Sequence, residues 1–260
     1  PNKELKLLAK SFQKCHRLLV HSIEDLNRLK NIGLVENVSL FPHGILDFSM
    51  ENTQYELKNK FTNKKNKRCI ASYGFCLPNK GYFELIKAIS ILNSKKFKVE
   101  LNIFSSIYNE NYYWVYNDLI KLVEKLNLTE LVKINKNYLP DNEVLKLLSA
   151  HDFSIFPYQE SNESSSAAVR HGLATCRPVM VTPLQIFDDV SEFVEYLPGS
   201  TPDLIAKGIF DWYGSQTNNN NEESKFIFKR SENIYHRRFS NLGVRLTSMI
   251  KGLEVNNNQS

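Results

Sequence analysis

Glu163 and the three serines after it form the segment of this 260-residue chain whose side chains best combine for chemistry. The segment follows a loop that contains Tyr158, and a helical pattern starts directly after it. The first N–H groups of a helix have no intrahelical partner, so Ser164, Ser165 and Ser166 would expose hydroxyls beside unpaired amides. Such groups bind phosphate or sugar hydroxyls. An ordinary N-cap needs only one serine, and we therefore interpret this segment as a cradle for a phosphate or a sugar.

The turn at residues 73–81 (YGFCLPNKG) is a second candidate, because it joins a strand pattern to a helical pattern through a glycine-containing loop. Gly74 permits close approach of a ligand to the backbone, and Lys80 at the helix start can bring its ammonium group to a phosphate oxygen. The same residues also suit a tight turn with a solvated lysine. The spacing alone does not separate these two interpretations.

Both candidates lie within an alternation of short apolar runs and longer amphipathic stretches. Several of the apolar runs are β-branched and unbroken, which is typical of strands buried on both faces. The predicted strands are Arg17–His21, Val38–Phe41, Cys69–Tyr73, Val99–Phe104, Leu131–Ile134, Phe153–Phe156, Val179–Thr182 and Val194–Leu197. Helical patterns cover residues 81–93, 112–126 and 142–149, and Asp141 is a candidate N-cap for the last of them. The alternation predicts an α/β fold, a doubly wound parallel sheet with helices on both faces.

Two breaks in this alternation suggest domain boundaries. Residues 42–44 (PHG) end a first part, and residues 1–45 hold too few elements for a domain but fit the end of one. An Asn-rich run at residues 217–223 precedes a last helical segment. We therefore divide the chain into residues 1–45, 46–230 and 231–253. The chain begins in helical pattern without an initiator methionine, so we expect a piece of a longer protein.

Composition argues against several classes of function. The net charge of +5 is mild, and its one dense run, residues 64–68, is typical of a solvated segment that leads into a strand rather than a nucleic-acid surface. No stretch approaches the ~20 apolar residues that a membrane span requires. Cys15, Cys69, Cys76 and Cys176 have no metal-ligand spacing and apolar neighbours, so we interpret them as reduced core thiols.

Asp188 and Asp189 are a pair of carboxylates that could be mistaken for a metal-binding set. Adjacent carboxylates on a helix point in different directions, which makes a shared metal ion an awkward fit. A solvated or capping role is the favoured interpretation. The six histidines are scattered without the spacing of a metal motif, so we predict no metal site.

The order of several segments resembles the retaining family 4 glycosyltransferases, which have the GT-B fold. The resemblance runs over about residues 15–253 and rests on the segments LLVHSIEDL (18–26), VSLFPHG (38–44), YGFCLPNKG (73–81), LPDNEV (139–144), AHDFSIFP (150–157), ESSSAAVRHGLA (163–174) and RPV (177–179). It implies a Rossmann-like donor-binding domain at residues 46–230, after the tail of an acceptor domain and its linker at residues 1–45. Residues 231–253 would be a helix that crosses back to the acceptor domain.

The resemblance also implies roles for single residues. Glu163 matches the acidic residue that faces the donor sugar, and Lys80 is one of two expected phosphate cations, so both are candidate catalytic residues. The family commonly has arginine where this chain has Phe75. The family's second acidic residue, eight positions after the first, binds the ribose; here that position is His171, beside Arg170. Either the ribose contact differs, or Arg170 contacts phosphate in place of the absent arginine.

The candidate donor-binding set drawn from these observations is Gly74, Lys80, Tyr158, Ser164, Ser165, Ser166, Arg170 and His171. Tyr138 and Tyr158 could flank the base or the sugar, although such aromatic residues are more often half-buried at strand ends.

The resemblance implies an enzyme domain that transfers a sugar from a nucleoside-diphosphate sugar to a glycan or lipid-linked acceptor with retention. Surface polysaccharide synthesis in the bacterial cytoplasm, with or without peripheral attachment to the inner membrane, is the expected setting. We expect no cofactor, no essential metal and no nucleic-acid partner, and most of the acceptor domain to be missing. The alternative is a non-catalytic binding or scaffolding module of a larger glycan-synthesis protein, because two expected polar contacts are absent.

Overall fold

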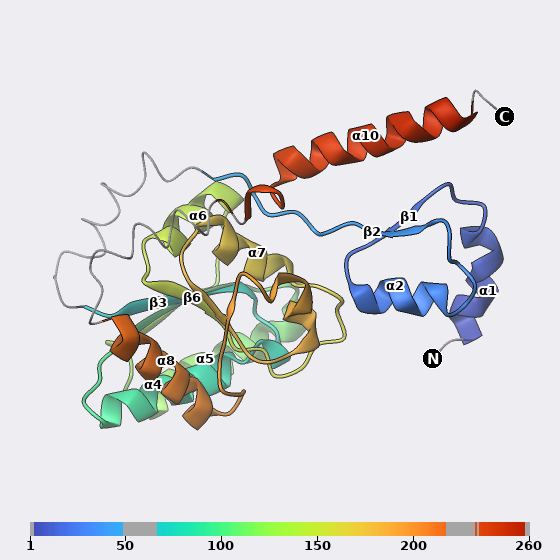
Figure 1. Ribbon diagram of the computed structural model, residues 1–260. Helices are drawn as coiled ribbons and strands as arrows, with labels where there is room; N and C mark the ends of the chain where they lie inside the picture. Colours follow the sequence, from blue (N-terminus) through green and yellow to red (C-terminus); the bar gives the residue numbers. More distant parts are fainter. Residues whose placement is uncertain (1–2, 49–66, 217–231, 233, 258–260) are drawn as a thin grey trace.

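The computed structural model describes residues 3–48, 67–216, 232 and 234–257. The predicted doubly wound architecture is confirmed: a parallel six-stranded sheet has the strand order β5-β4-β3-β6-β7-β8 (Figure 1). Its strands are β3 (Cys69–Phe75), β4 (Glu100–Ser106), β5 (Val132–Asn135), β6 (Phe153–Phe156), β7 (Val179–Val181) and β8 (Glu195–Tyr196). The order changes direction between β3 and β6, and in such folds ligands bind at that switch point, beyond the carboxyl ends of the strands.

Helices cover both faces of this sheet (Figure 1). One layer consists of α4 (Tyr82–Ser94), α5 (Tyr113–Lys125) and α8 (Pro202–Gln216), and the other of α6 (Asp141–Ser149) and α7 (Ala167–Ala174). Successive side chains of β3 alternate between the layers, since Ile70 packs with α4 whereas Ala71 packs with Val144 and Leu148 of α6. Both faces are therefore buried, and the central strands β3 and β6 are mostly apolar, each with one buried serine, Ser72 and Ser154.

The first part of the chain forms a separate two-stranded parallel sheet. Its elements are α1 (Lys3–Phe12), β1 (Leu18–Val20), α2 (Ile23–Lys30) and β2 (Val38–Leu40). The linker Pro42–Gly44 leads from this sheet toward the six-stranded one, and Ile45 is already buried in the core beside α7. The proposed boundary at residue 45 remains a prediction.

The prediction of one helix over residues 231–253 is wrong in its first part. Residue 231 lies outside the described residues, and a turn at 236–237 precedes α10 (Phe239–Asn257). The backbone of Ile45 causes this break, because it accepts a hydrogen bond from Phe239 N and donates one to Arg237 O. From there α10 extends toward the side of the molecule where β1 and β2 lie (Figure 1).

Other sequence expectations are only partly met. Cys69, Cys76 and Cys176 are buried thiols as predicted, but Cys15 is exposed after α1, so the core interpretation is wrong for it. Burial raises the pKa of Cys69 to about 12, which keeps it protonated at neutral pH. The Asn-rich run and most of the basic run at residues 64–68 lie outside the described residues. No described helix is long and apolar enough to cross a bilayer.

Candidate functional site

The carboxyl end of β3 brings the backbone close to the start of α7. Gly74 has φ +144°, and a Cβ atom there would lie 3.3 Å from the Tyr82 hydroxyl and 3.6 Å from Cβ of Ala168. The backbone continues through the short 3₁₀ helix η1 (Pro78–Lys80) into α4. The strand–loop–helix turn predicted from the sequence is therefore present at the carboxyl edge of the sheet.

Gly81, which the sequence analysis did not assign a role, fixes the position of this turn. Its φ of +75° is left-handed, and a Cβ atom there would lie 1.7 Å from the carbonyl oxygen of Pro157. Only glycine fits this contact without moving the backbone. The contact joins the start of α4 to the loop after β6, and that loop carries Tyr158 and Glu163. The one sequence signal for it was a glycine directly before a helical pattern.

Lys80, Tyr158 and Glu163 are brought together by this contact. The Lys80 Nζ atom lies 3.8 Å from Oε2 of Glu163 and 4.0 Å from the centroid of the Tyr158 ring. The Lys80 side chain is 14% exposed, whereas that of Glu163 is 62% exposed. Tyr158 is fully buried rather than half-buried, and its hydroxyl is 3.2 Å from Oγ of Ser166. In this arrangement the ammonium group of Lys80 can bind an anion, while the carboxylate of Glu163 can accept a hydrogen bond from a hydroxyl.

The three serines do not act as one unit. Ser166 is the N-cap of α7, and its buried hydroxyl accepts a hydrogen bond from Val169 N. Ser165 is half-buried, whereas Ser164 is exposed and lines a cavity. Ser166 therefore has the ordinary capping role, while the start of α7 still presents its first amides at the carboxyl edge of the sheet.

Arg170 lies in a buried environment of protein acceptors, and its contact with phosphate, one of the two alternatives that the sequence leaves open, stays a prediction. Its guanidinium donates hydrogen bonds to Asp189, to Ser166 O at 2.6 Å and to His43 O at 3.5 Å, and its side chain is only 3% exposed. Its donors are thus directed to protein acceptors from three segments of the chain. Burial lowers the pKa of Arg170, although Asp189 opposes this effect.

Asp189 also departs from the sequence analysis, because its carboxylate is 6% exposed and paired with Arg170 rather than solvated. Burial raises the pKa of Asp189, against the opposing influence of Arg170 and Arg237. Asp188 next to it is exposed, as expected. Within the described residues, no group of three or more His, Cys, Asp or Glu side chains could hold a metal ion.

His171 lies on α7 one turn after the helix start and contacts a carboxylate from another helix. Its Nε2 atom is 2.9 Å from Oδ1 of Asp141, and its ring centroid is 4.8 Å from that of Tyr73. Asp141 is the first residue of α6, and Pro140 occupies the N-cap position, so the N-cap prediction for Asp141 is wrong. This contact joins residues 30 positions apart, which no local pattern in the sequence could indicate.

Phe75 occupies the place where a second phosphate cation was expected. It is 44% exposed, and its ring packs edge-on against Tyr108 at 5.2 Å between centroids. Tyr138 is 74% exposed, so the half-buried strand-end interpretation is wrong for it. Lys80 is therefore the cation that these described residues place beside Glu163.

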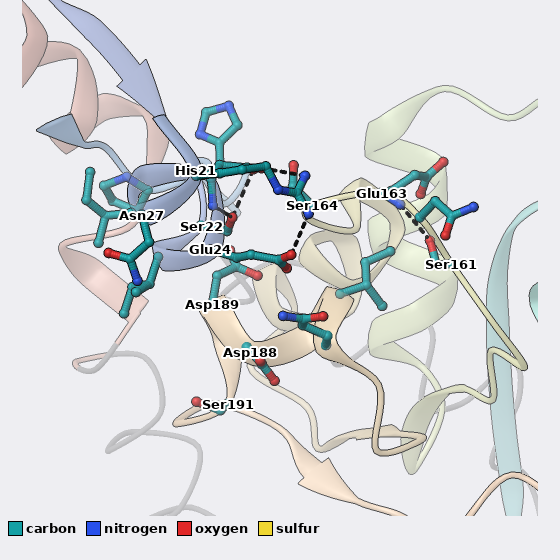
Figure 2. A pocket seen from close by; sticks show the side chains of 18 of the residues that line it. His21, Ser22, Glu24, Asn27, Ser161, Glu163, Ser164, Asp188, Asp189 and Ser191 are labelled. Atoms are coloured by element: carbon teal, nitrogen blue, oxygen red, sulfur yellow. Dashed lines mark hydrogen bonds and ion pairs between the residues drawn. The ribbon is translucent and has the colours of Figure 1, made fainter. Parts of the chain in front are cut away.

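A cavity of about 1160 Å³ separates this edge of the sheet from the first part of the chain. Figure 2 shows Glu163 and Ser161 on one side of it and Ser22 and Asn27 on the other. Glu163 and Ser164 are among the residues that line the cavity, so the cavity reaches the segment that carries the carboxylate next to Lys80. Most of the residues that line the cavity are polar or charged.

The comparisons with known proteins agree with this architecture. No protein-family model matches the sequence, and no curated protein matches it either. Similar solved structures include a glycosyltransferase from Rickettsia africae, with a TM-score of 0.76, 17% identity, and coverage of 96% of this chain and 66% of that one. Sucrose-phosphate synthase from Thermosynechococcus elongatus has a TM-score of 0.74 and 11% identity, with coverage of 98% and 63%.

HepE from Anabaena, solved in complex with UDP, is a further similar structure, with a TM-score of 0.72 and 12% identity over 92% of this chain and 64% of that one. The likeness at these identities is one of fold: the chain has the Rossmann-like architecture found in GT-B glycosyltransferases. It spans about two thirds of the length of these structures.

Replacing Gly81 tests the contact that positions Lys80. Gly81→Ala forces a side chain against the Pro157 carbonyl and into a left-handed conformation, so we expect a loss of stability of about 1–3 kcal/mol or more. Urea denaturation followed by circular dichroism measures this loss. Gly243→Ala is the matched control, because its Cβ meets nothing within 4 Å, and it should stabilise α10 by about 0.5–1 kcal/mol. Equal effects of the two substitutions would contradict the assignment.

Removing Asp189 tests whether Arg170 is structural. Asp189→Ala leaves a buried guanidinium without its counter-charge, so the free energy of unfolding should fall by about 3–5 kcal/mol. The exposed neighbour gives the control, since Asp188→Ala should change it by less than about 0.5 kcal/mol. Thermal and urea denaturation of both variants provide the measurement. A stable Asp189→Ala protein would return Arg170 to the list of candidate ligand contacts.

Proposed function

We propose that this chain is the nucleotide-sugar-binding part of a glycosyltransferase. The observation that carries the proposal is the Lys80–Glu163 pair, with 3.8 Å between Nζ and Oε2, at the carboxyl edge of a doubly wound sheet. The start of α7 and the close backbone approach at Gly74 lie at the same edge. A nucleoside-diphosphate sugar requires these three features together: a cation and free amides for the diphosphate, and a carboxylate for the sugar hydroxyls.

In the proposed reaction the diphosphate is the leaving group, and charge develops on its oxygen as the bond to the sugar breaks. The ammonium group of Lys80 and the first amides of α7 would stabilise that charge. Glu163 would accept hydrogen bonds from sugar hydroxyls and so hold the anomeric carbon toward the cavity. We propose transfer with retained configuration to a glycan or lipid-linked acceptor, with protein cations and the helix dipole in the role that a metal has elsewhere.

Exposed apolar side chains support the view that another domain packs on this chain. Leu19 and Leu40 on the small sheet are 38% and 44% exposed, and Val244 and Ile250 on α10 are 67% and 50% exposed. The similar structures are longer than this chain by about half its length again. We propose that an acceptor domain covers these surfaces, in a bacterial cytoplasmic enzyme of surface polysaccharide synthesis. This chain alone should then bind the donor but transfer its sugar slowly.

A non-catalytic module is the second candidate. Phe75 and Arg170 favour it, because the first replaces an expected cation and the second is directed to Asp189. A single lysine stabilises a leaving diphosphate less than two cations do. Such a module would bind nucleotide sugars without transferring them.

Isothermal titration of the chain with UDP, GDP and their common sugar conjugates tests the proposal. One nucleotide family should bind, and Lys80→Ala should weaken its binding by about tenfold to a hundredfold, as expected for losing a hydrogen bond to a charged group. Glu163→Ala should weaken the sugar conjugate more than the free nucleoside diphosphate, because its contact is with the sugar.

Lys87→Ala and Glu124→Ala are the controls, since both side chains are exposed on helices, α4 and α5, that pack against the same sheet. Neither should change the dissociation constant. A well-folded chain that binds none of these nucleotides would overturn the proposal and leave the site without a ligand. Binding that Lys80→Ala leaves unchanged would place the nucleotide elsewhere on the chain.

A further inference from the structure

Tyr158 lies beside the lysine of the proposed site, yet it has no part in the proposed chemistry. The Lys80 Nζ atom is 4.0 Å from the centroid of the Tyr158 ring. Tyr158 is only 1% exposed, whereas the Lys80 side chain is 14% exposed. A ligand at this edge of the sheet therefore meets the ammonium group rather than the ring. The ring can affect binding only through the neighbours that it holds in place.

Contacts with other segments of the chain fix Tyr158 itself. Its hydroxyl is 3.2 Å from Oγ of Ser166, the N-cap residue of α7. Its carbonyl oxygen accepts a hydrogen bond of 2.7 Å from Thr182 Oγ1, directly after β7. The ring also packs against that of Phe187, with 5.2 Å between the centroids. Tyr158 is thus held through its backbone, its ring and its hydroxyl, and it offers Lys80 a rigid aromatic face.

The ammonium group of Lys80 needs such a support. A lysine has a flexible four-carbon stem, so holding its charged end in one place costs conformational entropy. The Tyr158 ring and the Glu163 carboxylate both lie beside this charged end. Glu163 is 62% exposed and its Oε2 atom is 3.8 Å from Nζ, so water screens that ion pair. The buried ring is the stronger support, because the attraction of a cation to an aromatic face grows when water is excluded.

We infer that Tyr158 is a positioning residue, whose ring holds the ammonium group of Lys80 where a bound diphosphate can accept its N–H groups. An ammonium group has three donors, so contact with the ring on one side leaves donors for phosphate oxygens. Because the ring keeps Lys80 in place, Glu163 can exchange its contact with Lys80 for hydrogen bonds from sugar hydroxyls. The inference rests on the proposed function and adds the group that orients the cation before the ligand arrives.

Titration of the full chain and its variants with UDP and GDP tests whether Tyr158 acts through Lys80. Tyr158→Leu removes the aromatic face, so the affinity for the nucleotide that binds should fall by about two- to thirtyfold, the range of a cation–π interaction. Tyr158→Phe keeps the face and should retain most of the affinity. In the Lys80→Ala background, Tyr158→Leu should cause almost no further loss. An equal loss in both backgrounds would contradict the inference, because Tyr158 would then support only the fold.

Phe97→Leu is the matched control. It removes a contact of the same kind at the opposite, amino end of β3, where the guanidinium carbon of Arg68 is 3.9 Å from the centroid of the Phe97 ring. It should leave the nucleotide affinity unchanged. Thermal denaturation of each variant establishes that it is folded at the temperature of the titration.

Proton chemical shifts of the Lys80 side chain give a second test, which needs neither a ligand nor a destabilised variant. The ring current of Tyr158 shields protons above its face, so the ε-methylene protons of Lys80 should resonate upfield of those of exposed lysines such as Lys87. Tyr158→Phe should keep this shift. Absence of the shift in the wild-type chain would overturn the inference, and nucleotide binding would still support the proposed function. Absence of all nucleotide binding would overturn both.

Discussion

The backbone contact between Gly81 and the Pro157 carbonyl decides where Lys80 can lie. Two loops that leave neighbouring strands, β3 and β6, meet at this point, and no residue with a Cβ fits between them. The contact places the ammonium group of Lys80 over the Tyr158 ring. The Tyr158 hydroxyl in turn contacts Ser166 at the start of α7. A cation, a carboxylate and a helix start are thus collected at one edge of the sheet by packing alone. The proposed chemistry depends on this arrangement.

The Arg170–Asp189 pair holds the linker against the sheet. Arg170 contacts the carbonyl of His43 in the linker as well as the N-cap residue of α7. Burial makes the pair costly to break, so the linker, α7 and the segment that carries Asp189 are held as one unit. The cavity beside Glu163 is bounded by this unit on one side and by α2 and its flanking residues on the other. The two basic residues of this site therefore differ in their surroundings, since Arg170 is paired with Asp189 and Lys80 lies beside Glu163 at the carboxyl edge of the sheet.

The sheet was the part of the molecule that the sequence predicted best, because strands buried on both faces are mostly apolar, as β3 and β6 are apart from one buried serine each. Motif order placed Lys80 and Glu163 in one site, and the structure brings them together. The sequence did not predict the contacts between distant segments. The partner of Arg170 is 19 residues away and that of His171 is 30 residues away, and neither distance has a local signature. The break before α10 arises in the same way, from pairing with Ile45.

We propose that the edge formed by Gly74, Lys80 and the start of α7 binds a nucleoside diphosphate. Titration of the ¹⁵N-labelled chain with UDP and GDP, followed through amide chemical shifts, tests it most directly. We expect the largest saturable shifts on residues 73–82 and 163–171, with the remainder of the sheet little affected. Saturable shifts that gather on other elements, or none with either nucleotide, would contradict it.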